Sequence, residues 1–398
     1  MKLFFTDSTF LVDGVSSPNI PFLLDQDCKL VDVANDYLLY VALERGGTRS
    51  PKTWRNNGES LYDYFSWLEA NSRNWNDLAR SASLGRRISP LAAYRNWSLS
   101  LCSDKTGLKQ LKTTTINQRL TNLIGFYRWA KNRGLISELP WDVDIQRVPE
   151  KSATFLRHTH GAKYVEKDDI KLRVFKEPPK LLTLDQCKVF LASCTSPTLY
   201  LMTLLMLQTG LRNEECRTFP RKYVFDPTGL NKRKRIRIDL SPNDMLLKNG
   251  KPRTVFVTWH FMREIFDYVS IGEGAFRSNI GRKKSKITLR PVFLNRFGLE
   301  FSTKALNNAF RILCIDKKMV GFRVTPHMLR HTFATMELFH QGARMPTAQA
   351  LAWVRDRLGH NSIQTTSIYL HCIEQMDDEE MNEYQELLNS MIGGAIAK

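Results

Sequence analysis

The chain has 398 residues, of which 42% are hydrophobic and 25% charged, close to the average for globular proteins, and this excludes disordered and low-complexity classes. Lys and Arg number 58 against 40 Asp and Glu, so the formal net charge is +18. This excess is larger than solubility requires and predicts a polyanionic partner. At about 150 residues per domain, the length predicts two or three domains.

The cysteines and the apolar runs bear on cellular location. Seven cysteines lie far apart without a Cys-x-x-Cys pair, which indicates reduced thiols and argues against disulfides or a zinc site. The first residues do not resemble a signal peptide. The longest apolar-rich run, Leu199 to Leu207, is far shorter than the roughly 20 residues that span a bilayer. We therefore expect a cytoplasmic, nucleoid-associated bacterial protein without a membrane partner, and nucleic acid as the polyanion.

Residues 31–146 predict a small helical domain, preceded by an amino-terminal extension, 1–30, that the pattern does not explain. An amphipathic stretch covers 35–44, and Ser50 with Pro51 predicts the start of a second helix. Another helix is predicted from Thr113 to a C-cap at 132–134, because its apolar residues recur at helical spacing. Four tryptophans are expected to pack in the helical core: Trp54, Trp67, Trp97 and Trp129.

The second half predicts a linker at 147–179 and a domain at 180–398. The linker is rich in Lys, His, Arg and Pro. A capping box at Thr183 opens a helix, and a buried helix ends near Gly210. Two short strands are predicted at 236–240 and 254–257, joined through a turn, with helices from Trp259 onward. The fold class predicted is mostly α with a small β-sheet.

Several segments of the second half contain residues suited to chemistry on a phosphate. An arginine follows Thr-Gly-Leu, a lysine occupies a turn, and a His-Met-Leu-Arg-His run is followed later in the chain by Leu-Gly-His. A tyrosine follows the last histidine by nine residues. Each signal is weak alone, and their joint order is informative. The residues are Arg212, Lys248, His327, Arg330, His360 and Tyr369.

This order resembles the tyrosine recombinase, or phage integrase, family, whose motif is Arg, Lys, His-x-x-Arg, His or Trp, and Tyr. All six positions are filled, and the resemblance covers 180–375 and, more loosely, the helical domain, which is similar to the family's core-binding domain. The 36 residues from Arg212 to Lys248 are more than compact members use, so Lys251 is a rival for the catalytic lysine.

The resemblance implies a C-shaped clamp of two domains around double-stranded DNA. It implies a site-specific recombinase or integrase that cuts and rejoins DNA through a 3′-phosphotyrosyl intermediate, for integration, excision or transposition of a mobile element. Four protomers would synapse two DNA sites, with accessory DNA-bending or directionality proteins as further partners. No metal or other cofactor is implied, because the covalent ester stores the bond energy.

Cleavage of DNA through a covalent tyrosyl ester requires the same residue types. The phenol of Tyr369 can attack phosphorus and form the covalent ester. Arg212 and Arg330 offer planar bidentate donors to the phosphate oxygens as their negative charge grows. Lys248, on its turn, can protonate the leaving 5′ oxygen. His327 and His360 can hold oxygens or accept the tyrosine proton.

Other residues are expected to support the site or contact DNA. Glu215, one turn after Arg212, is expected to orient that region through hydrogen bonds, and His331 is a candidate for a supporting role. A second basic run, 282–286, is equally well explained as a solvated surface. The residues predicted to contact DNA are Thr115, Arg119 and Asn122 on the polar side of the 113–133 helix, and the run Lys232, Arg233, Lys234 and Arg235.

Two alternatives stay open at this point. A type IB topoisomerase uses similar chemistry on one duplex, although the recombinase-like helical domain argues against it. A DNA-binding relative that lost the reaction is disfavoured by the complete residue set.

The end of the chain carries a prediction of its own. Residues 374–386 contain seven acidic residues and no basic one, followed by apolar positions at helical spacing. We expect this tail to dock onto a neighbouring protomer, with packing on its own domain as the alternative.

Overall fold

The computed structural model divides the chain into two compact units, Met1–Lys176 and Glu177–Lys398. Each unit is described by itself below. None of the helices in the described part of the chain is long and apolar enough to cross a membrane. The structure describes residues 1–46, 50–77, 88–101, 110–147, 164–174, 177–284, 291–316 and 322–373.

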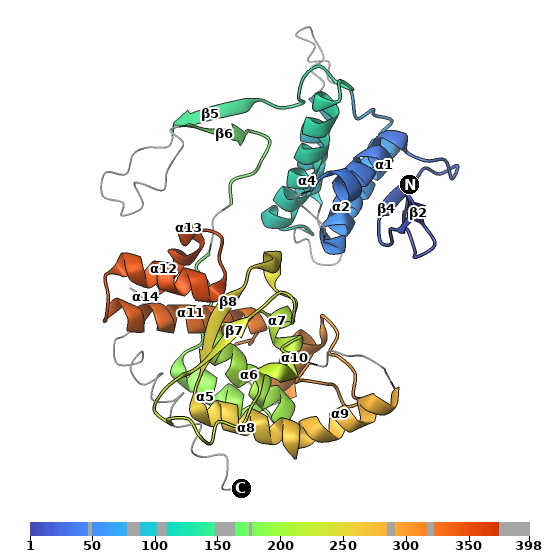
Figure 1. The fold of residues 1–398 in the computed structure, drawn as a ribbon. Coiled ribbons are helices and arrows are strands. Elements are labelled where there is room, and N and C mark those ends of the chain that lie inside the picture. The colour runs from blue at the N-terminus through green and yellow to red at the C-terminus, as the bar shows by residue number, and fades with distance from the viewer. Residues whose placement is uncertain are drawn as a thin grey trace. The chain divides into compact units, whose positions relative to one another are not determined.

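The amino-terminal unit is built mainly from helices, of which α1, α2 and α4 are labelled in Figure 1. Its core lies where α2 packs against α4, and it is rich in aromatic side chains. The hydroxyls of Tyr64 and Tyr127, one on each helix, lie 2.5 Å apart in this core. The helical elements are α1 (Asp32–Leu39), the π-helix η1 (Tyr40–Glu44), α2 (Pro51–Ala70), α3 (Pro90–Ser100) and α4 (Thr113–Asn132).

The tryptophan prediction is correct for two of the four side chains. Trp67 and Trp129 are buried in this core, and Trp54 is partly buried against it. Trp97 is 37% exposed, which corrects the expectation of a core residue, although its ring lies 5.8 Å from the ring of Tyr94.

Short strands precede the helices in the range that the sequence left unexplained. They are β1 (Lys2–Phe5), β2 (Leu11–Val12), β3 (Val15–Ser16) and β4 (Pro21–Leu24), and β1 pairs antiparallel with β4. The side chain of Asn35 bonds both the N–H and the C=O of Leu23, at 2.7 and 3.0 Å. A Cβ on Gly58 of α2 would lie 2.5 Å from Cβ of Pro21, so this sheet packs closely on the helices.

A second hairpin forms the end of this unit. β5 (Val143–Arg147) pairs antiparallel with β6 (Tyr164–Asp168), and β6 lies inside the range expected as a linker. Asp168 accepts hydrogen bonds from Arg128 of α4 and from the indole of Trp141, each at 2.8 Å. These bonds join the hairpin to the helical core.

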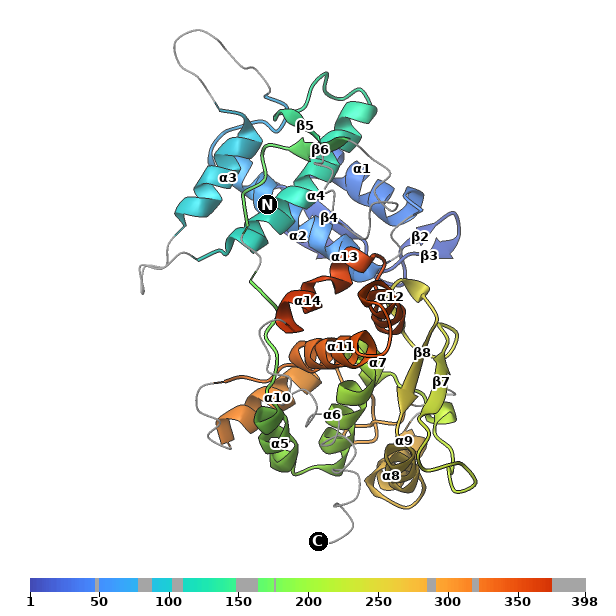
Figure 2. The ribbon, with the colours of Figure 1, turned by 90° about the vertical axis from the view of Figure 1, so that its left-hand side faces the viewer.

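The carboxy-terminal unit is mostly helical around one β-hairpin, and Figure 2 shows it from a second side. The helix start predicted at Thr183 and the predicted strand pair are present. Its elements are α5 (Leu184–Ser193), α6 (Pro197–Thr209), α7 (Asn213–Arg217), the 3₁₀-helix η3 (Arg221–Tyr223), β7 (Ile236–Leu240), the 3₁₀-turn η4 (Lys248–Gly250), β8 (Arg253–Val257), α8 (Trp259–Ser270), α9 (Glu273–Lys284), α10 (Ala305–Asp316), α11 (Pro326–Gly342), α12 (Thr347–Leu358), α13 (Ile363–Thr366) and α14 (Ile368–Ile373).

Helix α6 is the centre of this unit and packs against α11. From Leu201 to Thr209 every residue of α6 is buried, which explains its uniformly apolar sequence. The helix ends at Gly210 in the left-handed conformation with φ 63°, and a Cβ there would lie 2.4 Å from the ring of Phe333 on α11. Glycine is therefore required both by the backbone angle and by the close approach of α11.

The predicted fold class, mostly α with small sheets, is confirmed. Hairpin β7–β8 buries alternate side chains on the core, with Ile236, Ile238 and Leu240 from β7. Helices α12 and α14 pack on α11. The acidic tail at 374–398 and the last two residues of the basic run at 282–286 lie outside the described residues.

Candidate active site

Arg212 lies at the turn between α6 and α7. Because Gly210 ends α6, the chain reverses and Arg212 becomes the N-cap of α7. Its Nη1 donates to Oε1 of Glu215 at 2.9 Å, and its backbone N–H donates to Oε2 at 2.8 Å. Its Nη2 also donates to the carbonyl oxygen of Gly359 at 3.4 Å, so the guanidinium, about one fifth exposed, is held in a defined direction.

Glu215 is held by a second arginine, which the sequence did not single out. Arg253, the first residue of β8, donates to both carboxylate oxygens, at 3.1 and 2.5 Å, and both side chains are buried. Burial acts to raise the pKa of Glu215, but the Arg253 bonds and charge and the Arg212 charge outweigh it and lower the pKa to about 2. Glu215 is thus a buried anion that joins the Arg212 turn to the β-hairpin.

Arg330 is the most deeply buried cation of the site. It lies on α11 and is 2% exposed, and its guanidinium donates to the carbonyl oxygens of Gly210 at 2.6 Å and Leu358 at 2.7 Å. Burial, followed by the charge of Arg212, lowers its pKa to about 9. These bonds fix α11 against the ends of α6 and α12, so Arg330 and Arg212 lie at one locus.

Tyr369 lies on α14, which packs against α11, and its ring is 1% exposed. Its hydroxyl lies 3.0 Å from Nδ1 of His331. Burial raises the pKa of Tyr369 to about 12, although the charges of Arg330 and Arg212 oppose that shift. The phenol is therefore protonated near neutral pH and is in contact with a group that can take its proton.

The three histidines near Tyr369 all favour the neutral form. Burial, with the charge of His327 and then of Arg330, lowers the pKa of His331 to about 4. Burial, with Arg330 and Arg212 next, lowers the pKa of His360 to about 3, and Nδ1 of His360 lies 3.0 Å from the Thr366 hydroxyl. Neutral imidazoles can accept protons, so this cluster suits general-base chemistry.

Lys248 is exposed at the tip of the β7–β8 hairpin, in η4. The following Asn249 takes a left-handed conformation with φ 62°, which makes the turn tight. The pKa of His327 is lowered by burial, then by the charges of Arg330, Arg212 and Lys248. The charge of Lys248 is thus among those felt by His327, and the choice between Lys248 and Lys251 as the catalytic lysine remains a prediction.

A cavity opens beside the histidines, with a volume of about 640 Å³. His327 and His331 line it, and their ring centroids lie 4.3 Å apart. Lys180 and Arg323 add positive charge to its wall. An anionic group can therefore reach the imidazoles from this side.

The residues predicted to contact DNA have other surroundings. Arg119 pairs with Asp63 at 2.5 Å, and the amide of Asn122 donates to Ser60 at 2.9 Å and to the carbonyl of Asn56 at 3.1 Å, whereas Thr115 is exposed. Arg119 and Asn122 therefore have partners within their own unit. Contact of these two side chains with DNA remains a prediction. The run from Lys232 to Arg235 is exposed before β7.

Comparison with known proteins gives the class. The model of the phage integrase family matches residues 180–376. Transposase A from transposon Tn554 of Staphylococcus aureus is 26% identical over 94% of this chain and 98% of its own length. Tyrosine recombinase XerC of Chlamydia trachomatis serovar L2 is 40% identical over 66% of this chain and 70% of its own.

A solved structure shares the fold. The Tn1549 transposon integrase, in complex with circular intermediate DNA, superposes with a TM-score of 0.55 and 19% identity over 85% of this chain and 94% of that one. The chain therefore belongs to the phage integrase family of tyrosine recombinases. These relatives support the recombinase prediction and not the type IB topoisomerase alternative.

Proposed function

We propose that this chain cuts and rejoins DNA with Tyr369 as the nucleophile. The observation that carries the proposal is the 3.0 Å contact between the Tyr369 hydroxyl and Nδ1 of His331, beside Arg330 and Arg212. The phenol oxygen attacks phosphorus and forms a 3′-phosphotyrosyl ester, while the bond from phosphorus to the 5′ oxygen breaks. Its proton passes to the neutral imidazole of His331.

The other residues of the site act on the charges of this step. Arg212 donates to the nonbridging oxygens, and Arg330 adds its charge to the same locus. Lys248 delivers the proton to the departing 5′ oxygen from the hairpin tip. His327 and His360 hold phosphate oxygens, and the reverse attack by a 5′ hydroxyl rejoins the strand. Glu215 positions Arg212 and takes no part in proton transfer, since its pKa near 2 keeps it ionised.

The buried phenol adds a requirement to this mechanism. Tyr369 is 1% exposed, so its hydroxyl cannot reach a phosphate while α14 keeps this position. Helix α14 therefore has to shift when the scissile phosphate enters the site. The proposal therefore includes a conformational step that couples DNA binding to exposure of the nucleophile.

The proposed assembly follows the family. Four protomers act on two DNA sites held together, each with its two units forming a clamp around the duplex, and the acidic tail docks on a neighbouring protomer. The reaction serves integration, excision or transposition of a mobile element, with accessory DNA-bending or directionality proteins. The similarity to a transposase over 94% of the chain supports the mobile-element role.

A covalent adduct tests the central claim. The protein is incubated with duplexes from the flanks of its own gene, quenched in detergent and examined for DNA linked to protein, and the linked residue is identified by mass spectrometry. We expect an adduct on Tyr369 with the parent and none with Tyr369→Phe, although binding stays close to parental. An adduct that persists in the Phe variant would assign the reaction to another nucleophile. Complete absence from the parent would favour the silent DNA-binding relative.

A further inference from the structure

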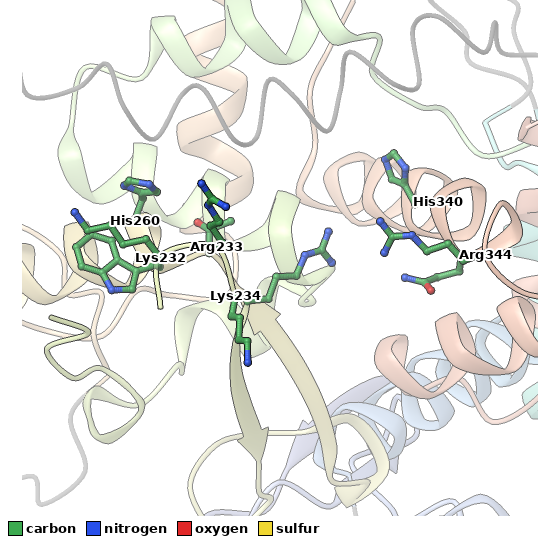
Figure 3. A pocket seen from close by; sticks show the side chains of 10 residues that line it. Lys232, Arg233, Lys234, His260, His340 and Arg344 are labelled. Atoms are coloured by element: carbon green, nitrogen blue, oxygen red, sulfur yellow. The ribbon is translucent and has the colours of Figure 1, made fainter. Parts of the chain in front are cut away.

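The β7–β8 hairpin has two ends with different surroundings. At its open end, basic side chains of the segment before β7 face the carboxyl end of α11 across a cavity of about 560 Å³, as Figure 3 shows. Arg235 at this end pairs with Glu337 of α11 at 3.3 Å. The other end carries Lys248 and, where β8 begins, Arg253. The placement of the proposed catalytic lysine therefore depends on contacts at the turn end.

The tip of the hairpin lies between two buried anchors. Lys248, Asn249 and Gly250 are exposed, and the N–H of Gly250 donates to the carbonyl oxygen of Leu247 at 3.0 Å. Leu247, just before the tip, is buried in the core of the unit, and Arg253, three residues after the tip, is buried as well. Since the tip itself is exposed, these two flanking residues hold it.

The two anchors differ in what they fix. Leu247 contributes apolar contacts, which have no preferred direction. Arg253 donates from both terminal nitrogens to Glu215, at 3.1 and 2.5 Å, and this paired geometry defines an orientation. Glu215 in turn accepts from the side chain and the backbone N–H of Arg212. One carboxylate therefore aligns the base of the lysine turn with the arginine proposed to bind the phosphate.

Arg253 also contacts a third segment of the site. A Cβ on Gly359 would lie 3.3 Å from Cδ and 3.4 Å from Nη1 of Arg253, and Gly359 has a positive φ of 63°. This glycine directly precedes His360, and its carbonyl oxygen accepts from Nη2 of Arg212 at 3.4 Å. Arg253 therefore joins the lysine hairpin to the segments of two other motif residues.

Stability alone does not account for a charged pair at this place. Desolvation of two buried charges offsets much of their attraction, so well-packed apolar residues can hold a fold equally well. Nε of Arg253 is also buried without a hydrogen-bond partner among the described residues, which carries a further cost. What the pair adds is a fixed orientation.

We propose that Arg253 is a positioning residue that sets how Lys248 meets the leaving 5′ oxygen. The proposal rests on the proposed function, in which Lys248 gives its proton to that oxygen as the bond to phosphorus breaks. Arg253 acts through Glu215 and does not contact the reacting atoms. Since a displacement of about 1 Å at a reacting group can slow a reaction by about 10², loss of this anchor should mainly slow protonation of the leaving group.

Two simpler roles of Arg253 predict a different result. If it acted only on Arg212 through their shared carboxylate, its loss would weaken stabilisation of the nonbridging oxygens, whatever the leaving group. If it only stabilised the fold, its loss would reduce the amount of active protein. The leaving group therefore separates the proposal from both.

A change of leaving group tests the proposal. Single-turnover cleavage at saturating DNA is measured for the parent, Arg253→Met and Arg253→Lys, on a duplex with the normal bridging 5′ oxygen and on one with sulfur in its place. The sulfur leaves as a thiolate and needs no proton. The ratio of the two rates does not depend on how much protein is folded, because both rates come from the same preparation.

We expect Arg253→Met to slow cleavage of the oxygen substrate by about 10 to 100 times more than cleavage of the sulfur substrate. Arg253→Lys keeps the charge and can keep one bond to Glu215, so its effect should be smaller and in the same direction. An equal loss on both substrates would overturn the proposal. Failure of sulfur to rescue Lys248→Ala is a separate result, which would overturn the role of Lys248 and this proposal with it.

Arg217→Met is the matched control. Arg217 is a buried arginine of the same unit, and its Nη1 donates to the carbonyl oxygen of Phe301. Like that of Arg253, its Nε has no partner among the residues described. Loss of this side chain should lower stability and leave the oxygen-to-sulfur ratio of the parent. A ratio changed as much as in Arg253→Met would overturn the proposal, since any buried arginine would then have this effect.

A double-mutant cycle with Lys248 gives a second measure of the same coupling. If Arg253 acts through the lysine, Arg253→Met should slow cleavage of the oxygen substrate much less when Lys248 is already replaced by alanine. Two losses that multiply fully in the double variant would contradict the proposal.

Discussion

At the scale of single residues, His331 is the group most changed in importance by the structure. The sequence offered it only a supporting role, with His327 and His360 as the proton acceptors. In the structure its Nδ1 contacts the Tyr369 hydroxyl, whereas Nδ1 of His360 contacts Thr366. Spacing alone does not reveal this, because His327 and His331 are four residues apart and share one face of α11, so the sequence does not show which ring meets the phenol.

Replacing His331 should therefore slow cleavage more than binding. For His331→Ala we expect single-turnover adduct formation to fall by about 10²–10⁴, the usual range for loss of a general base, with little change in DNA affinity. His331→Gln keeps a polar contact to the phenol but removes the imidazole nitrogen that accepts its proton, so it should stay slow. Parental rates in the Gln variant would show that His331 only positions Tyr369.

The Glu215–Arg253 pair makes a prediction about stability and pH. Arg253→Met leaves the buried carboxylate of Glu215 with one partner fewer. The free energy of unfolding of the carboxy-terminal unit should therefore fall by about 3–5 kcal/mol at pH 7. In the parent, the pKa of Glu215 is depressed to about 2, so its contribution is complete above about 4.5 and is lost as pH falls toward 2. The difference in free energy of urea unfolding between parent and variant should therefore narrow as the pH falls through that range. A difference that stays constant with pH would contradict the lowered pKa of Glu215.

At the scale of elements, the β7–β8 hairpin carries Lys248, the proposed catalytic lysine, at its tip. Its strands were predictable from their alternation, and the turn from Asn249 and Gly250. The choice between Lys248 and Lys251 was not, because both belong to the same short connection. In the structure the charge of Lys248 contributes to lowering the pKa of His327, which connects the hairpin tip to the histidines.

A substrate with sulfur in place of the bridging 5′ oxygen separates the two lysines. The thiolate leaves without a proton, so this substrate should restore cleavage by Lys248→Ala to near the parental rate. It should not restore Arg212→Ala, which lacks a donor to the nonbridging oxygens. Rescue of Lys251→Ala, with Lys248→Ala fully active on normal DNA, would move the role to Lys251.

Gly210 connects helix packing to the site. Gly210→Ala would have to fit a methyl group 2.4 Å from the Phe333 ring at a positive φ, so α6 and α11 must separate. Since the Gly210 carbonyl accepts from Arg330, we expect a loss of stability of roughly 1–3 kcal/mol together with slower cleavage. Gly134→Ala, also at positive φ but with open space around it, is the matched control and should affect stability without slowing cleavage.

At the scale of the whole molecule, the sequence predicted the main helices and the hairpin, because helical periodicity and strand alternation are local signals. The roles of the six motif residues remain predictions. It did not predict the packing of residues 1–24 on the first unit, since strand pairing between Lys2–Phe5 and Pro21–Leu24 depends on contacts distant in the chain. Arg253 was missed for the same reason. Its sequence position suggests only a strand residue, and its partner lies 38 residues earlier.

The tail belongs to the assembled protein and makes the last prediction. Deleting residues 376–398 should leave binding to a single DNA site intact, because the removed segment contains six acidic residues and only one basic one, in a chain at +18. It should weaken cooperative assembly on paired sites, measured by gel shift with one and two sites. A truncated chain that assembles and recombines like the parent would exclude a role for the tail between protomers.

The buried Glu215 also limits how this protein can change over generations. A substitution at Arg253 alone leaves a charge without its partner, and one at Glu215 alone leaves two arginines competing without an anion. Either single substitution therefore lowers the stability of the fold, whereas some double substitutions can restore the charge balance around the buried site. We expect these two positions to covary among descendants, with Arg212 excluded from the exchange because the reaction needs its guanidinium. The three side chains are thus inherited as one unit even though they come from separate segments of the sequence.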